Sequence, residues 1–267
     1  MQSPPSPIVF DIGVFSLHYY GVIMFVAIIF ALFVIRFVAH RYYKDVDTEI
    51  LLDVLPFVIL SSILGARLYY VVMDFSYYSK HLPEILAIWN GGMSIHGGIL
   101  GGVLSGFIIS KFKKISFFKY ADVVSYGLIL GQAIGRFGNY FNCEAFGKPC
   151  SIPFLKLFIP LIHRPMGYEN FEYFHPTFLY ESIWDLLVFI VLFFIVRRIV
   201  SVRNLSNGTV FCSYLILYSI GRFFIEWCRL DSVKDLFGLP IAQVVSVFVI
   251  VFSALLLIFL NKKENKS

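Results

Sequence analysis

The stretch Gly131-Gln-Ala-Ile-Gly-Arg-Phe-Gly-Asn-Tyr-Phe-Asn-Cys-Glu-Ala-Phe-Gly147 changes character along its length. Its first residues continue an apolar helix and its last residues form a polar loop, so Arg136, Asn139 and Glu144 fall where hydrocarbon gives way to water. A charged guanidinium is costly at membrane depth, and such residues are usually paired or lie on a substrate path. We therefore expect Arg136 to have an anionic partner. The alternative is that Arg136 only snorkels to the interface while the asparagines cap backbone groups.

The whole chain has the composition of a polytopic membrane protein. Its 267 residues are 58% hydrophobic and 15% charged, with a mean hydropathy of +0.79, which excludes an ordinary soluble domain. Apolar runs that can cross about 30 Å of hydrocarbon predict seven spans. The predicted fold is an all-α integral membrane protein that forms one domain over residues 1–267, with a small outer loop at about 138–175 between the fourth and fifth helices. The predicted spans are 19–37, 51–73, 93–109, 120–135, 176–196, 209–227 and 239–260.

The basic residues predict the orientation of these spans. Of the 22 lysines and arginines, thirteen lie beside the spans on one side of the membrane and six on the other. Because basic residues favour the cytoplasm, we expect the N-terminus outside and the C-terminus inside. The net charge of +5 thus reflects topology and does not imply a nucleic-acid partner. The first seven residues have no basic region and no small-residue cleavage site, so we expect no removable signal peptide.

Small residues and cysteines add two further expectations. Glycines recur every fourth residue in the third and fourth predicted helices, which allows close packing against a neighbouring helix. The four cysteines have no metal-binding spacing such as Cys-x-x-Cys, and we predict neither a metal nor a cofactor. Cys143 and Cys150 share the outer loop and would pair in an oxidising compartment, but two free thiols are at least as well supported. The glycines of the two stripes are Gly98, Gly102 and Gly106, with Gly97 and Gly101 beside them, and Gly127, Gly131 and Gly135.

Polar and titratable residues gather near the outer halves of six predicted helices. The topology is assigned from loop charge alone, so this gathering is independent of the assignment. One shared site facing the outer leaflet explains this better than nine separate structural residues. These residues are Tyr20, Arg67, His96, Arg136, Asn139, Glu144, His175, Arg222 and Glu226.

Several of these residues also have a structural interpretation. A lone histidine such as His96 is more often a hydrogen-bonded structural residue, but Gly97 and Gly98 leave its ring accessible and an imidazole titrates near neutrality. Arg67 either snorkels or adds positive charge to a cavity. Tyr20 is an interfacial anchor unless it joins the site.

Two helical faces combine acidic and basic groups. Tyr218, Arg222 and Glu226 step by four and share one face; the arginine and glutamate either only neutralise each other or leave donors free for a second anion. Glu181 shares its face with Asp185, and a structural counter-ion role is favoured for Glu181. Two or three arginines with a histidine suit a lipid that carries phosphate, because planar guanidinium binds phosphate oxygens bidentately. A transporter of anions or lipids is the rival interpretation, although the sequence shows neither the internal repeats nor the midplane site common among transporters.

Four motifs, in this order along the chain, resemble those of the bacterial prolipoprotein diacylglyceryl transferases. They are Ser94-Ile-His-Gly-Gly-Ile-Leu100, Gly135-Arg-Phe-Gly-Asn-Tyr-Phe-Asn-Cys-Glu-Ala-Phe-Gly147, His175-Pro-Thr-Phe-Leu-Tyr-Glu181 and Gly221-Arg-Phe-Phe-Ile-Glu226. The resemblance covers about residues 18–229 and includes the seven-span, N-out architecture. Phe178 stands where the family pattern leads us to expect glutamine, and Cys143 where it leads us to expect glycine.

The resemblance implies transfer of the sn-1,2-diacylglyceryl group from phosphatidylglycerol to the lipobox cysteine thiol of a preprolipoprotein signal peptide. A thioether would form and glycerol 1-phosphate would leave, at the outer, periplasmic side of the bacterial cytoplasmic membrane. In this reaction we expect Arg136 and Arg222 to be catalytic by binding the phosphate. His96 is the candidate catalytic base on general-base reasoning, with shaping of the lipid headgroup pocket as the alternative. Substrate-binding residues would be Tyr20, Arg67, Gly97, Gly98, Asn139, Glu144, Gly147, Tyr218 and Glu226, supported by His175, Tyr180 and Glu181.

Overall fold

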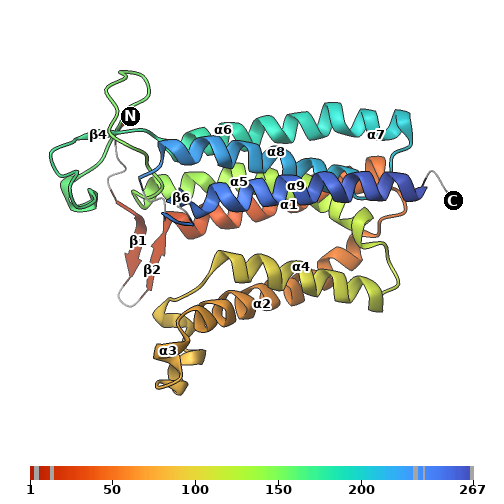
Figure 1. The fold of residues 1–267 in the computed structure, drawn as a ribbon, viewed down its shortest axis with the longest axis horizontal. Helices are drawn as coiled ribbons and strands as arrows, with labels where there is room; N and C mark the ends of the chain where they lie inside the picture. The colour runs from red at the N-terminus through yellow and green to blue at the C-terminus, as the bar shows by residue number, and fades with distance from the viewer. Residues whose placement is uncertain (3–5, 13–14, 231–233, 237, 265–267) are drawn as a thin grey trace. The chain divides into compact units, whose positions relative to one another are not determined.

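The computed structural model is mostly helical (Figure 1) and describes residues 1–2, 6–12, 15–230, 234–236 and 238–264. It divides into two compact units, a large unit of Met1–Arg41 and Ala121–Ser267 and a small unit of Tyr42–Tyr120. The single-domain prediction stays a prediction. Residues 3–5 of the N-terminal segment, on which the signal-peptide expectation partly rests, lie outside the described residues.

The small unit is built on two long helices that pack against each other, α2 (Thr48–Met73) and α4 (Ile95–Phe112). Between them lie the short helix α3 (Phe75–Tyr78) and the 3-10 turns η1 (Leu82–Leu86) and η2 (Ile88–Asn90). The Asp47 side chain caps α2 by accepting a hydrogen bond of 2.9 Å from the Glu49 N–H. This contact satisfies one of the backbone donors that a helix start leaves open.

Glycines let α2 and α4 approach backbone to backbone. A Cβ at Gly101 would lie against the Ser61 carbonyl, and one at Gly97 would lie against the Gly65 carbonyl. The glycine stripe predicted for this helix is therefore used in packing. Van der Waals contact and small residues are the main source of helix association in lipid, where the hydrophobic effect between helices is absent.

Replacing Gly101 by alanine is expected to destabilise the small unit. The added methyl group would meet the Ser61 carbonyl, and overpacking of this kind costs about 1–3 kcal/mol. Thermal unfolding of the detergent-purified protein would measure the loss. Gly106→Ala is the matched control on the same helix, because its methyl group would meet only Phe117 Cε2 at 3.8 Å. Equal melting temperatures for the two variants would contradict the packing role.

The large unit contains the remaining long helices. They are α1 (Tyr19–Tyr42), α5 (Phe117–Phe141), α6 (Thr177–Ile190), α8 (Thr209–Ile225) and α9 (Ile241–Glu264). A π-helical turn η4 (Val191–Val196) continues α6 into α7 (Arg197–Arg203), and the 3-10 turn η5 (Glu226–Cys228) extends α8. Two hairpins, β1 (Ile8–Ile12) with β2 (Phe15–His18) and β5 (Lys234–Leu236) with β6 (Leu239–Pro240), precede α1 and α9.

A buried acid connects α5 to α8. The carboxylate of Asp122 accepts hydrogen bonds of 2.7 Å from the backbone N–H groups of Gly208 and Phe211. A carboxylate at a helix N-terminus satisfies open donors and interacts favourably with the helix dipole. The start of α8, and with it the register of Arg222, is therefore fixed relative to α5.

Between α5 and α6 the chain forms a small folded cap, residues 142–176, which lies beyond the ends of the helices in Figure 1. Its strands β3 (Leu157–Phe158) and β4 (Tyr173–Phe174) pair antiparallel, and η3 (Leu161–His163) follows β3. A core made of Phe146, Leu157, Ile159, Phe174 and, from the start of α6, Phe178 is almost fully buried. The N-terminus joins this cap, because the Met1 ammonium donates to the Lys156 carbonyl at 2.7 Å.

Among the described residues, five helices are long and apolar enough to cross a membrane. They are α1, α2, α4, α8 with its extension to Cys228, and α9 up to Lys262. These coincide with five of the seven predicted spans. The other two fall on α5, which carries Gln132, Arg136 and Asn139, and on α6, which is only 14 residues long before the π turn. That these two also cross the membrane, and that the N-terminus lies outside, stay predictions.

Candidate active site

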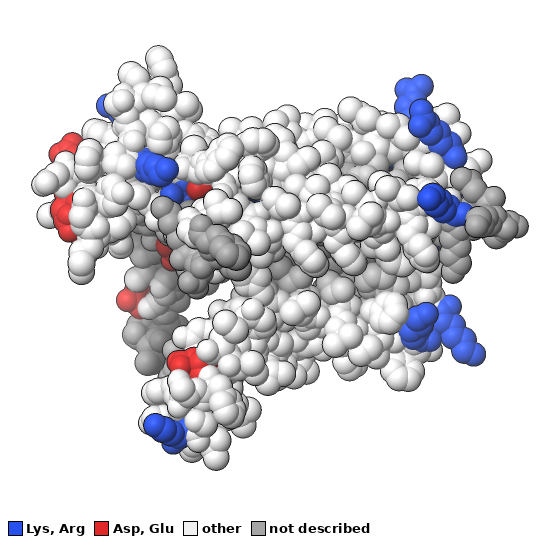
Figure 2. Space-filling view, viewed as in Figure 1, with Lys and Arg blue, Asp and Glu red and all other residues white. Residues whose placement is uncertain are grey.

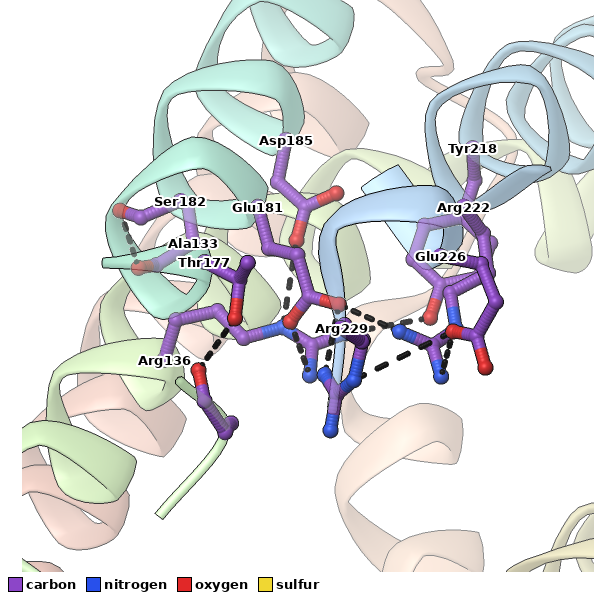
Figure 3. Close-up of polar contacts among 11 residues, drawn as sticks. Ala133, Arg136, Thr177, Glu181, Ser182, Asp185, Tyr218, Arg222, Glu226 and Arg229 are labelled. Carbon is purple, nitrogen blue, oxygen red and sulfur yellow. Dashed lines mark hydrogen bonds and ion pairs between the residues drawn. The ribbon is translucent and has the colours of Figure 1, made fainter. Parts of the chain in front are cut away.

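The carboxylate of Glu181 on α6 stands among three arginines of the large unit (Figure 3). Its Oε2 lies 2.8 Å from Nη1 of Arg136, and its Oε1 lies 2.5 Å from Nη1 of Arg222 and 3.0 Å from Nη1 of Arg229. The glutamate side chain is only 3% exposed. One buried anion is thus the shared counter-ion of guanidinium groups from α5, α8 and the end of η5.

Two further carboxylates complete this arginine cluster, which we define as Arg136, Glu181, Asp185, Arg222, Glu226 and Arg229. Oε2 of Glu226 lies 2.9 Å from Nη2 of Arg222 and 3.9 Å from Nε of Arg229. Oδ2 of Asp185, one turn further along α6 than Glu181, lies 3.9 Å from Nε of Arg136. Three cations and three anions balance when all six are ionised, which limits the cost of burying them.

Two arginines of the cluster are partly exposed and can bind a further anion. The side chains of Arg136 and Arg222 are 21% and 22% exposed, whereas the carboxylates are 3% exposed. Arg136 also donates from Nη2 to the Tyr218 hydroxyl at 3.3 Å. A guanidinium has five N–H donors, so the carboxylates and the hydroxyl leave donors available for phosphate oxygens.

Hydrogen bonds between helices hold α6 in place beside the cluster. The Ser182 hydroxyl donates to the Ala133 carbonyl of α5 at 2.7 Å, and the Trp184 indole donates to the Leu217 carbonyl of α8 at 2.9 Å. A Cβ at Gly221 would collide with the Trp184 ring. The absence of a side chain at Gly221 therefore lets α6 and α8 approach closely enough for Glu181 to reach Arg222.

Gly147 places the end of η5 against the cap. Its N–H donates to the His175 carbonyl at 2.7 Å, and a Cβ at this position would lie against the Cys228 carbonyl and 2.9 Å from Thr177 Cγ2. Gly147 also pairs with Arg229 in an antiparallel bridge. Because any side chain here would push η5 away, Gly147 acts on the position of Arg229. Beside it, Nδ1 of His175 and the Tyr180 hydroxyl lie 3.0 Å apart.

The other predicted residues of the large unit lie at the end of α5 and beside it. The Tyr20 ring packs against Gly138, where a Cβ would meet its Cδ2 at 2.7 Å. The Asn139 carbonyl accepts from the Glu144 N–H at 2.9 Å, and Asn142 donates from Nδ2 to Oε1 of Glu144 at 3.2 Å. These bonds close the turn that follows α5 and leave Glu144 exposed.

Cys143 occupies a left-handed backbone conformation in this turn, with φ of 53°. Glycine adopts this conformation without a steric penalty, which gives a physical reason for the glycine expected at this position. All four cysteines are free in the structure. Burial, with a smaller effect of the Glu144 carboxylate, raises the pKa of the Cys143 thiol, so the thiolate is disfavoured and Cys143 is a poor nucleophile.

Replacing Cys143 by glycine is expected to stabilise the protein by up to about 1 kcal/mol, because the left-handed strain disappears while some unfolded-state entropy is gained. The melting temperature of the detergent-purified protein would measure this. Asn142→Gly, at a neighbouring position without positive φ, should lower the melting temperature instead. A decrease for Cys143→Gly as large as that for Asn142→Gly would contradict the backbone argument.

The predicted residues of the small unit have their own surroundings. His96 is exposed at the start of α4, with its ring centroid 6.1 Å from that of Tyr69. Gly97 is buried against α2, whereas a Cβ at Gly98 would make only ordinary contacts of 3.5 and 3.6 Å. Gly97 thus has a packing role, and substrate binding by these glycines stays a prediction.

Arg67 is committed to the loop of its own unit. Its guanidinium donates to the carbonyls of Ile85, Gly91, Gly92 and Glu84 at 2.8, 2.8, 2.9 and 2.5 Å, and it lies 5.1 Å from the centroid of the Tyr78 ring. It neither snorkels, since the residue is buried, nor has more than one of its five N–H donors left. Arg67 therefore holds the connection between α2 and α4, and contact with a substrate phosphate stays a prediction.

Arg229 is the cluster residue that sequence reasoning missed. It is one of the six basic residues that the sequence places on the outer side, and it lies three residues after Glu226 and seven after Arg222, a spacing that keeps one helical face if α8 continues. The turn η5 supplies that continuation. The spacing was therefore the available signal.

Comparison with known proteins identifies the family of this chain. The family model described as prolipoprotein diacylglyceryl transferase matches residues 7–259. A protein of Trichormus variabilis named phosphatidylglycerol–prolipoprotein diacylglyceryl transferase is 46% identical over 246 residues, 91% of this chain and 85% of the relative. A protein of Bacillus velezensis with the same name is 41% identical over 262 residues, 98% of this chain and 94% of the relative. With a family match over nearly its whole length and relatives well above 30% identity, this chain belongs to the prolipoprotein diacylglyceryl transferase family.

Proposed function

We propose that the chain transfers the sn-1,2-diacylglyceryl group of phosphatidylglycerol to the lipobox cysteine thiol of a preprolipoprotein. The sulfur displaces the phosphate at the glyceryl carbon, so that a C–S bond forms and a C–O bond breaks. The products are a thioether and glycerol 1-phosphate. Membership of the family carries this proposal, and the arginine cluster supplies chemistry that fits it.

The arginine cluster suits the change of charge in this reaction. The phosphodiester of the lipid has one negative charge, and the departing monoester develops a second. The exposed faces of Arg136 and Arg222 would then bind the leaving group more strongly than the bound lipid. Interactions that strengthen towards the transition state accelerate a reaction, whereas uniform binding does not.

Other residues would position the two substrates. Glu226 would orient Arg222 through the 2.9 Å ion pair, and Gly147 would set the place of η5. Asn139 and Glu144 would shape the turn after α5, while Tyr20 and Tyr218 would line the lipid site.

A base is useful because the attacking thiol has an ordinary pKa of about 8.5 and reacts as thiolate. His96 is the candidate, since an exposed imidazole at a helix start can accept the proton. The proton released by the thiol would finally reach the phosphate monoester or solvent, which balances the reaction.

Replacing His96 by asparagine is expected to lower kcat/KM by about 10²–10⁴-fold and to remove the limb of the pH–rate profile that reports the base. The measurement is transfer to a lipobox peptide across the pH range. His163→Asn, at an exposed histidine of η3 in the cap, is the matched control. An unaltered profile for His96→Asn would exclude His96 as the base.

The proposed place of action is the bacterial cytoplasmic membrane, with the site towards the outer, periplasmic side. In the large unit, lysines and arginines gather where α7 and the C-terminal helix end (Figure 2), which supports placing that end in the cytoplasm. The partners would be the bilayer, phosphatidylglycerol and the signal peptide of a preprolipoprotein.

An assay with purified protein tests the reaction directly. Labelled phosphatidylglycerol and a lipobox peptide are incubated with the detergent-solubilised chain, and mass spectrometry detects the diacylglyceryl thioether and glycerol 1-phosphate. Movement of labelled lipid across the membrane of vesicles that contain the protein, without any lipidated peptide, would instead identify a transporter. Transfer to a peptide whose cysteine is replaced by serine should be absent, because the thiol is the nucleophile.

A further inference from the structure

The cap between α5 and α6 leaves its most exposed apolar side chains at the tips of its loops. Phe154 is 92% exposed, Ile162 87% and Met166 95%. The same segment buries Leu157, Ile159 and Phe174 in its own core. The three exposed side chains therefore contrast with other apolar residues of the cap, which are buried. Contact of these side chains with apolar material would be favourable, because it removes their apolar surface from water.

The loop that carries Ile162 and Met166 is closed by its own polar groups. Arg164 donates from Nε to the Ile159 carbonyl at 2.9 Å and from Nη1 to the Glu169 carbonyl at 2.7 Å. The Glu169 carboxylate in turn accepts from the Gly167 N–H at 3.0 Å. These bonds order the loop that carries Ile162 and Met166, with both side chains exposed.

The position of the cap points to lipid as the contacting material. It starts directly after α5 and ends directly before α6, and in Figure 1 one of its loops rises beside the end of α6 while the other extends beyond the helix ends. With α6 crossing the membrane as predicted, lipid would surround its exposed apolar face, so a loop beside this helix end would lie over the headgroups. This holds whichever side of the membrane the cap occupies.

Two cations, Lys156 and Arg164, follow Phe154 and Ile162 by two residues along the chain. Nζ of Lys156 is 4.2 Å from the centroid of the Tyr173 ring, and the Arg164 guanidinium is 5.9 Å from that of Phe158. Apolar side chains, aromatic rings and neighbouring basic groups together favour the headgroup region, where the apolar parts enter the acyl boundary and the cations meet anionic lipids.

We propose that Phe154, Ile162 and Met166 anchor the cap in the interface of the adjoining membrane leaflet. The anchor would hold the cap at a fixed depth over the helix ends that carry the arginine cluster. It stands on the cap's own geometry and does not require the proposed transfer reaction.

Spin-label accessibility tests this anchor in vesicles of phosphatidylethanolamine and phosphatidylglycerol. Labels are introduced by Phe154→Cys, Ile162→Cys and Met166→Cys in a background in which the two partly exposed cysteines carry Cys143→Ser and Cys228→Ser. Matched controls are Asn170→Cys and Glu172→Cys, which are exposed polar positions of the same cap. Relaxation by oxygen, which concentrates in lipid, is compared with relaxation by a water-soluble nickel chelate.

We expect oxygen to be the stronger relaxant at the three tips and nickel at the two controls. Nickel accessibility at the tips equal to that at the controls would overturn the anchor. Tips that are open to nickel and become protected only when a lipobox peptide is added would also overturn it, because the surface would then belong to a protein substrate. Neither readout depends on activity, so a failure of the transfer assay leaves this test decisive.

Discussion

Replacing Arg136 by alanine is expected to abolish diacylglyceryl transfer while the protein remains inserted in the membrane. The variant loses a guanidinium that faces both Glu181 and the open side of the cluster. Removing a single preorganised donor already costs about 10²–10³-fold in rate, and Arg136 supplies several donors and a charge. The measurement is thioether formation in membranes, with the amount of inserted protein determined in parallel.

Two further variants give this experiment its control. Arg136→Lys keeps the charge but cannot contact Glu181 and Tyr218 with a planar fork, so it should recover only a small part of the rate. Arg198→Ala removes an exposed arginine on α7 and should leave transfer unchanged. Full activity of Arg136→Ala would remove phosphate binding by this arginine from the mechanism.

Replacing Glu181 by glutamine is expected to reduce both activity and stability strongly. The three arginines would lose the anion they share, and an uncompensated buried charge costs about 3–5 kcal/mol. Without that anion, Arg136 and Arg229 also repel Arg222, so the spacing of the phosphate donors changes. Transfer rate and melting temperature would be measured on the same preparation.

Glu169→Gln is the matched control for this substitution, because Glu169 is exposed in the cap. Its effect on both quantities should be small. If Glu181→Gln had the melting temperature and the transfer rate of the wild-type protein, Glu181 would not be the counter-ion that organises the cluster.

Arg67 and Arg136 show where prediction from the sequence ends. Both are single arginines towards one end of an apolar helix, and hydropathy and helical spacing do not show which groups each guanidinium contacts. In the structure Arg67 donates hydrogen bonds to four backbone carbonyls. Arg136 instead contacts two carboxylates, and its side chain is partly exposed. The difference depends on which loops and helices fold against each arginine, and that is a property of tertiary contacts.

The apolar runs, the glycine spacing and the ordered motifs can be recognised in the sequence without coordinates. Hydrophobicity and side-chain size act locally along the chain, so they predicted helices and close packing, and the ordered motifs predicted the family. In the arginine cluster, the Arg222–Glu226 pair could be predicted from its spacing of four, but the contacts of Glu181 with the arginines could not. Arg222 and Arg229 meet Glu181 across 41 and 48 residues of sequence, and only the packing of α6 against α5 and α8 brings their charges together. Glu181, which the helical pattern suggested as a supporting counter-ion, became the centre of the site because ion pairing depends on distance in space and not on separation along the chain.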